Sequence, residues 1–361
     1  MDSLTQIVLG SSVAAACVER GQRRKALILG GVLGLLPDLD VLIDYGNPVE
    51  NFVNHRSFSH SLFVLVPFSF LLWLLLRRSW RVIRVSSHRW LLAILLALVT
   101  HPLLDAHTAY GTQLWWPLSV PPTMWSTLFI IDPLYTVPLL VGAVATALKP
   151  RLRVSGLLLG TGLALSSVYL GWSWLAKGMV ERHVTANLDG GELADAPRFS
   201  TPTPLNTLVW RVIVMTNDGY KEGYDSVLAR GPVRFRSYSS ERQAVQAASD
   251  IWAVERLRWF SHGFLRATVE EDRLILSDLR MGQHANYVFS HIVARHQRGH
   301  WEAMAPVRVP TSFDVGVLEE TWKHLWQARL RHPHQLDGNG LKRYPLSVAP
   351  TPTHGTSRRD G

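Results

Sequence analysis

Cysteine is nearly absent from this chain of 361 residues, which contains Cys17 alone. A single thiol excludes an intrachain disulfide and a metal site built from several thiolates. Charged residues are also scarce, at 18% of the chain against 47% apolar residues, and the first half holds nearly all of the long apolar runs. No basic stretch precedes the first apolar run, so we expect no cleaved signal peptide.

Motifs for nucleic-acid binding, glycine-rich phosphate loops and internal repeats are also missing. The net charge of +9 would fit a nucleic-acid partner. Much of the basic excess, however, lies in short loops beside apolar segments, where membrane topology explains it. We therefore expect a lipid bilayer as the partner and no nucleic acid.

The apolar runs predict a multi-span α-helical membrane domain of about six helices in residues 1–176. A small α+β soluble domain is expected in residues 177–331, followed by a disordered tail in residues 332–361. The expected spans cover residues 3–18, 27–44, 61–76, 90–106, 128–148 and 154–175. Several are shorter than the roughly 20 residues of an untilted span, and residues 3–18 are rich in small residues, so whether that run crosses stays open.

Basic residues gather in alternate loops, which are residues 20–25, 77–89 and 149–153. The loops between them, residues 45–60 and 107–127, contain a single lysine or arginine, which is Arg56. Because basic loops stay on the cytoplasmic side, this pattern predicts a multi-pass protein of the cytoplasmic membrane with an extracytoplasmic C-terminal domain.

Ionisable residues converge on the outer ends of four expected spans, and such residues at a membrane are candidates for function. The predicted metal ligands are Asp38, Asp40, His60, His101, Asp105 and Asp132. His101 and Asp105 are four residues apart and share a helix face. Asp38 and Asp40 align only if the chain is extended, which Pro37 makes plausible. Helix capping and hydrogen bonds between helices are the alternative explanation, above all for Asp132.

Two further residues are assigned to catalysis. Arg56 lies four residues before His60, on its face, and can steady an anionic group. His55 is interpreted both as a further ligand and as a histidine that supports the ligands. Asp44 and His107 are expected at helix ends, and Trp115, Trp116 and Trp125 in an aromatic belt at the membrane surface.

Mixed imidazole and carboxylate ligands suit a divalent metal, with zinc first and manganese or iron as alternatives. One ion and two ions are equally compatible with the set. A metal at the membrane surface can activate water for hydrolysis.

Three motifs in order resemble those of bacterial YdjM-like inner-membrane proteins, described as membrane-bound metal-dependent hydrolases. They are Gly34-Leu-Leu-Pro-Asp-Leu-Asp40, His55-Arg-Ser-Phe-Ser-His-Ser61 and His101-Pro-Leu-Leu-Asp105, the last followed by Tyr110-Gly111 and Trp115-Trp116-Pro117. The resemblance covers about residues 1–140. It implies a multi-span inner-membrane protein with metal-dependent hydrolase activity.

The leading hypothesis is a membrane-bound metal-dependent hydrolase that acts on a phospholipid or another membrane-associated ester or phosphoester. One alternative is a membrane scaffold that holds its metal structurally and binds a partner. The other is a transporter of ions or protons, which favours ionisable residues at several depths rather than at one end.

In the second half, strands are expected over residues 207–216, 220–228, 264–269, 273–278 and 287–295, and a helix over residues 240–261. His262, His284, His291, His296 and His300 lack a compact ligand pattern and are expected to be scattered surface histidines.

Overall fold

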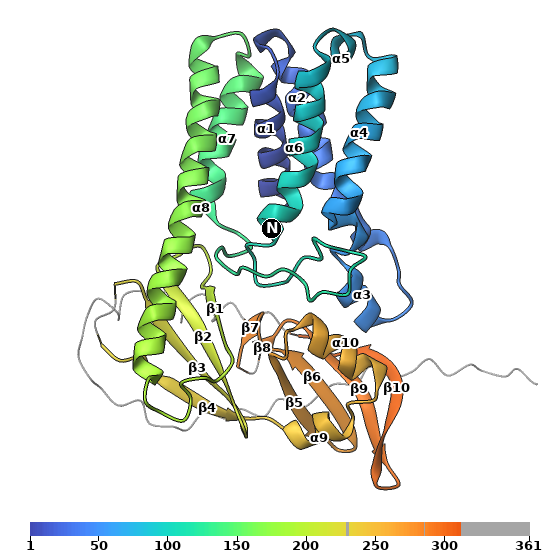
Figure 1. The fold of residues 1–361 in the computed structure, drawn as a ribbon, viewed down its shortest axis with the longest axis vertical. Helices are drawn as coiled ribbons and strands as arrows, with labels where there is room; N and C mark the ends of the chain where they lie inside the picture. Colours follow the sequence, from blue (N-terminus) through green and yellow to red (C-terminus); the bar gives the residue numbers. More distant parts are fainter. Residues whose placement is uncertain (229–230, 285, 312–361) are drawn as a thin grey trace, which may run out of the picture.

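The computed structural model describes residues 1–228, 231–284 and 286–311. An α-helical bundle stands at one end of the molecule and two antiparallel sheets at the other, joined by one long helix (Figure 1). The bundle helices are α1 (Ser3–Cys17), α2 (Arg23–Leu35), α4 (Leu62–Ser79), α6 (Ser87–Asp105), α7 (Pro133–Leu148) and α8 (Arg153–Leu188). The predicted tail, residues 332–361, lies outside the described residues.

Among the described residues, three helices are long and apolar enough to cross a membrane, namely α4, α6 and α8. The helices α1 and α7 are apolar but shorter. A helical membrane domain followed by a β-sheet domain is therefore confirmed, while the count of six spans is not.

The helices α1 and α2 pack closely against each other because glycines line their contact. A Cβ atom on Gly30 would meet the carbonyl oxygen of Gly10 and, at 2.6 Å, the Cβ of Ala14. A Cβ atom on Gly10 would lie 2.9 Å from the Cα of Gly34. Because the two backbones touch, α1 can lie deep in the bundle, where it also contacts α6 and α7.

Short helices connect the long ones at both ends of the bundle. They are η1 (Arg20–Gln22), η2 (Leu36–Leu42), α3 (Pro48–Asn54), η3 (Phe58–His60) and α5 (Arg81–Val85). Figure 1 shows α5 at the end away from the sheets and α3 beside them. The segments with the predicted ligands therefore lie toward the sheets.

The helix α8 is 36 residues long and continues past residue 176, where the sequence suggested a domain boundary. Ala176, Val180 and Val184 on its outer half pack against Trp210 and Val212 of the first sheet. The helix thus belongs to both parts of the molecule.

Each sheet has four antiparallel strands. The first has the order β1 (Arg198–Pro202), β2 (Val209–Thr216), β3 (Gly219–Ser226) and β4 (Phe235–Ser239). The second has the order β10 (His300–Arg308), β9 (Ser290–Gln297), β6 (Arg273–Asp278) and β5 (Leu265–Glu270). A small hairpin of β7 (Gly282–Gln283) and β8 (Asn286–Tyr287) and the helices α9 (Arg242–Ala247) and α10 (Trp252–Phe260) complete this half.

The strand predictions agree with β2, β3, β5, β6 and β9 within a few residues. The helix expected over residues 240–261 is two helices, because the chain breaks between Ala247 and Trp252. Ser249 and Asp250 lie in this break, and short polar side chains of this kind favour turns over helix interiors.

The second sheet shares a hydrophobic core with the loops at the near end of the bundle. Phe52 of α3 and Tyr110 pack against Phe260 of α10, with ring centroids 4.7 Å and 5.4 Å from the Phe260 ring. The Tyr110 hydroxyl donates to the Phe52 carbonyl oxygen at 2.6 Å. The C-terminal half is thus packed directly on the segments that carry the candidate site.

The expectation of surface histidines is wrong for His291. Its side chain is buried between the second sheet and the bundle loops, with its ring centroid 5.5 Å from that of Phe52. Its Nε2 has no hydrogen-bond partner among the described residues. Burial, together with the nearby charge of Arg308, lowers the pKa of His291 to about 4.

The buried His291 predicts that the protein loses stability in acid. The unfolded chain binds a proton at its ordinary pKa of about 6.5, whereas the folded chain does not until about pH 4. The free energy of unfolding should therefore fall by about 1.4 kcal/mol per pH unit as the pH drops through this window. Denaturant titrations should show a flatter dependence of this free energy on pH for His291→Phe than for the wild type. His88→Phe, a change at an exposed histidine, is the control. Equal slopes in all three proteins would contradict this prediction.

Candidate metal centre

Local structure at the end of the bundle nearer the sheets follows from three sequence features. Pro37 ends the helical hydrogen bonding of α2 and starts the 3₁₀ helix η2, which carries Asp38 and Asp40. Ser61 caps α4 by accepting from the backbone of Phe63, so η3 and His60 are fixed just before that helix. Pro102 lies inside α6, between His101 and the end of the helix at Asp105.

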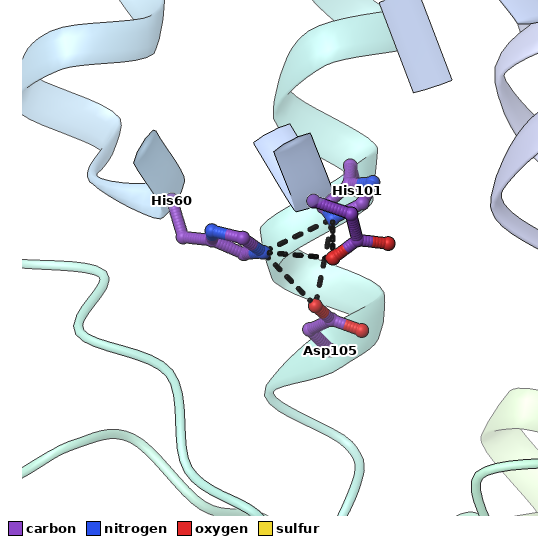
Figure 2. Close-up of side chains that lie close together, drawn as sticks. His60, His101 and Asp105 are labelled. Carbon is purple, nitrogen blue, oxygen red and sulfur yellow. Dashed lines mark hydrogen bonds and ion pairs between the residues drawn. The ribbon is translucent and has the colours of Figure 1, made fainter. Parts of the chain in front are cut away.

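Four of the predicted ligands meet at one point. Asp38, His60, His101 and Asp105 each offer one donor atom, and these four atoms all lie within 4.8 Å of one another. Figure 2 shows His60 approaching from its own turn toward His101 and Asp105 on α6. The side chains of His60, His101 and Asp105 have no exposed surface, whereas that of Asp38 is 17% exposed.

Five of the six distances between the donor atoms match the edges of a metal-sized tetrahedron, and the sixth, between Asp38 and Asp105, is at most 4.8 Å. The Nε2 atoms of His60 and His101 are 3.1 Å apart, and each lies 3.2–3.5 Å from Asp105 Oδ2. Asp38 Oδ1 lies 3.5 Å from His60 Nε2 and 3.4 Å from His101 Nε2. Ligands at about 2.0–2.1 Å from a tetrahedral zinc ion are about 3.3 Å from each other.

The far side of each imidazole fixes which nitrogen faces the centre. His101 Nδ1 lies 2.6 Å from the carbonyl oxygen of Gly34, which can only accept. Ser59 donates its proton to Asp40 at 2.6 Å, so its oxygen accepts from His60 Nδ1 at 2.9 Å. Both Nε2 atoms therefore present lone pairs to the centre, in the arrangement that metal-ligating histidines show.

Asp105 is arranged in the same way, with one carboxylate oxygen bound by supporting groups and the other facing the centre. Its Oδ1 accepts from the Met1 nitrogen and from Gln6 Nε2, the latter at 3.0 Å. Its Oδ2 points to the centre, is buried and accepts no hydrogen bond from a described residue. Two imidazole lone pairs and two carboxylate oxygens around one point repel each other unless a cation lies between them, so these residues fit a divalent metal.

The structure places Asp40 behind the four-atom group rather than in it. Its carboxylate accepts from Ser59, from the Arg56 backbone at 2.8 Å and from His55 Nδ1 at 2.8 Å. These bonds connect η2 with the turn that carries His60. Asp40 thus orients the neighbours of the centre.

His55 has its Nδ1 proton held by Asp40, which leaves Nε2 without a proton. The ring lies 6.2 Å from the His60 ring, and a quarter of the side chain is exposed. A carboxylate that fixes one imidazole tautomer in this way is typical of histidines that transfer protons.

Arg56 is buried beside the centre in a left-handed backbone conformation, with φ of 64°. Its Nε lies 3.2 Å from Asp105 Oδ2 but makes no hydrogen bond within the described residues, and Nη1 donates weakly to Thr108 at 3.3 Å. Its guanidinium covers the Tyr110 ring at 5.0 Å. A buried guanidinium with unused donors next to a metal-ligand set can bind an anion.

The remaining candidates lie elsewhere. Asp132 caps α7, accepting from Leu134 at 3.1 Å and from the Tyr169 hydroxyl at 2.9 Å. Asp44 is exposed and accepts from the Gly46 backbone. His107 packs beside Trp125 and Trp174. None of these three belongs to the four-residue group.

The sequence reasoning missed several supports of the site, namely Gln6, Gly34, Ser59 and Thr108. Gln6 was recognisable as an amide in a run of small and apolar residues. The role of Gly34 resides in its carbonyl oxygen, for which a side-chain pattern gives no signal.

Comparison with known proteins gives one match. Residues 1–180 match the family model described as YdjM inner membrane protein. No curated protein and no solved structure matches the chain.

Proposed function

Because the chain belongs, through residues 1–180, to the YdjM inner membrane protein family, we propose that it is a membrane-bound metal-dependent hydrolase. Its substrate is a phospholipid or another ester or phosphoester held in the membrane. The observation that supports this most is the convergence of four donor atoms from three separate segments at the end of the bundle.

Zinc is the metal that this set suits best, with manganese and iron as alternatives. When bound, the ion supplies a Lewis acid that activates water and polarises the substrate. Asp38, His60, His101 and Asp105 hold it. The protein's own contribution is to keep both histidines in the ligating tautomer and to bring two further groups next to the ion.

Arg56 binds the anionic part of the substrate. Its unused donors lie beside Asp105 Oδ2, so a phosphate next to the ion is within their reach. The free Nε2 of His55 takes a proton from the attacking water and then gives it to the leaving group, while Asp40 holds Nδ1. An acid–base group positioned in this way contributes about 10²–10⁴-fold to a rate.

The orientation of the protein follows from its charge pattern. The basic loops 20–25, 77–89 and 149–153 lie at the end of the bundle opposite the sheets (Figure 1). With these loops in the cytoplasm, the centre and both sheets are extracytoplasmic. Six crossings, including α1 and α2, are part of this proposal.

A second candidate function rests on the same four residues. Four protein ligands close a tetrahedral site, as in structural zinc sites, whereas catalytic sites keep a position open. A scaffold with a structural metal is therefore the competing proposal. The unused donors of Arg56 and the Asp40–His55 pair favour the hydrolase, since a structural metal needs neither. A transporter is less well supported, because the residues that cluster lie at one end of the bundle.

Hydrolysis assays separate these functions. The purified protein, loaded with zinc in detergent, is tested on phosphodiesters, phosphomonoesters and carboxylic esters. The hydrolase proposal predicts turnover of at least one class that a chelator abolishes. Stoichiometric zinc without turnover of any class would support the scaffold.

Arg56→Met should slow phosphodiester hydrolysis by about a hundredfold, because an electrostatic donor to the reacting group is lost. Zinc content should stay at the wild-type value, which elemental analysis checks. Arg151→Met is the matched control, since Arg151 is exposed at the other end of the bundle. An equal loss of rate in both variants would contradict the role of Arg56.

A further inference from the structure

Large apolar side chains are exposed around the one open side of the metal centre. We call them the collar, which consists of Leu39, Val41, Leu42, Phe58, Trp116 and Leu118. Val41 is 69% exposed, Leu42 79% and Leu118 55%. Exposed apolar residues occur singly on most proteins, but a contiguous group marks a contact surface.

The collar is continuous with the helices of the bundle. Its first part is η2, which follows α2 directly, and Phe58 begins η3, just before α4. The turn with Trp116 is bound to the start of α4, because Ser61 donates to the Trp116 carbonyl oxygen at 2.6 Å and Leu62 to that of Leu114 at 2.9 Å. The rings of Phe58 and Trp116 lie 6.3 Å apart.

Among the described residues, the exposed part of the metal centre faces this surface. Asp38 is the one ligand with an exposed side chain, and it lies in η2 next to Leu39. On the sheet side, the loop 107–127 covers the centre with the buried residues Thr108 and Tyr110. The C-terminal half holds that loop, because Arg280 Nη1 lies 3.2 Å from Met124 Sδ and His262 Nε2 lies 2.8 Å from the Pro122 carbonyl oxygen.

Lipid is the occupant that fits the collar. The run from Trp115 to Pro122 contains no charged residue, and the carboxylate of Asp40 in η2 is turned inward and 4% exposed. Such an uncharged surface with a tryptophan, placed at the ends of membrane helices, is typical of the boundary between headgroups and hydrocarbon.

We propose that the collar is immersed in the outer leaflet and that the substrate is an amphiphile, with a hydrocarbon tail and a phosphoester head, which reaches the centre sideways from the lipid past Asp38. The immersion stands on the exposed residues alone, whereas the substrate class and route rest on the proposed function. The tail stays among the collar residues while the head meets the ligands and Arg56.

Fluorescence quenching tests the immersion. Cys17 is the only cysteine, so a Cys17→Ser background accepts one new thiol at a time. A polarity-sensitive probe is attached to Val41→Cys, and to Leu228→Cys as the control, because Leu228 is 68% exposed on the C-terminal half. In phosphatidylglycerol–phosphatidylcholine vesicles, doxyl-labelled lipids should quench the probe at residue 41 and aqueous iodide the probe at residue 228. Iodide quenching at residue 41 equal to that at residue 228 would overturn the immersion.

Activity tests the route. Leu42→Glu should lower hydrolysis of a vesicle-borne phosphoester lipid by about tenfold, while bis(p-nitrophenyl) phosphate in solution is hydrolysed within about twofold of the wild-type rate. Leu228→Glu should change neither. An equal loss on both substrates, or no loss on the lipid, overturns the route.

The two arms separate the two proposals. A wild type that binds zinc but hydrolyses neither substrate refutes the hydrolase and the route together, while the quenching still decides whether the collar is immersed. If the quenching shows immersion but Leu42→Glu does not slow the lipid substrate selectively, the hydrolase proposal stands and the proposal of an amphiphilic substrate is refuted.

Discussion

Replacing His101 and Asp105 together with alanine removes stoichiometric zinc from the purified protein. The two residues supply half of the donor atoms of the centre, and a single imidazole and carboxylate cannot hold the ion against dilution. Elemental analysis should give about one zinc ion per wild-type chain and only background zinc in the double variant. Activity that depends on the metal disappears with it.

The matched control for this experiment is His88→Ala with Asp189→Ala, one histidine and one aspartate that are both exposed. Asp105 also pairs with Arg56 and Gln6, so the double variant carries a risk of misfolding. His60→Gln provides a second route, because it removes one ligand and leaves those contacts in place. A folded wild type without stoichiometric metal, or a double variant that retains it, would remove the hydrolase proposal.

Asp40→Asn should be the most damaging single change that leaves all four donor atoms in place. Zinc affinity should fall by about 10–100-fold, as for other residues that support metal ligands, while saturating zinc still loads the site. The rate of the loaded enzyme should fall by about a further 10²-fold, because the new amide can donate to His55 Nδ1 and so shift its proton to Nε2. Zinc titrations and rates at saturating zinc measure the two effects separately.

This variant also decides the role of Asp40. If Asp40 were itself a metal ligand, Asp40→Asn would bind as little zinc as the double variant, even at a saturating zinc concentration. The control is Asp44→Asn, since Asp44 is exposed and bonds only within its own turn and to Asn51. Unchanged affinity and rate in Asp40→Asn would mean that the bonds to His55, Arg56 and Ser59 do not support the site.

Much of the candidate site could be predicted from the sequence, because ionisable residues stand out in apolar segments. His101 and Asp105 share a helix face by spacing alone, and α6 keeps that geometry to its last residue. The break at Pro37 was also predictable. The supports were not, since Ser59 and Thr108 are common surface residue types whose meaning depends on which segments the fold brings together.

Asp38 and Asp40 show a finer limit. Two residues apart, they would align in an extended chain, but η2 is a 3₁₀ helix, in which each residue turns the direction by about 120°. Asp38 therefore faces the centre and Asp40 faces His55. Sequence indicates a break after Pro37 but not which local geometry follows it.

In the C-terminal half, short runs rich in Val, Ile and Leu predicted β2 and β6 well. The strands β1, β4 and β10 were missed. β4 and β10 have no buried residue and so lack an apolar face in the sequence, whereas the burial of β1 depends on packing against distant segments. Phe199 in β1, for example, is buried against Phe264, at 5.6 Å between ring centroids.

The unbroken helix α8 has a mechanical consequence. At 1.5 Å per residue its 36 residues extend about 54 Å, well beyond the roughly 30 Å of bilayer hydrocarbon. Trp210 and Val212 of the first sheet are packed on the projecting part. Because the helix is continuous, a change in bilayer thickness that alters the tilt of α8 also changes the orientation of the first sheet relative to the membrane.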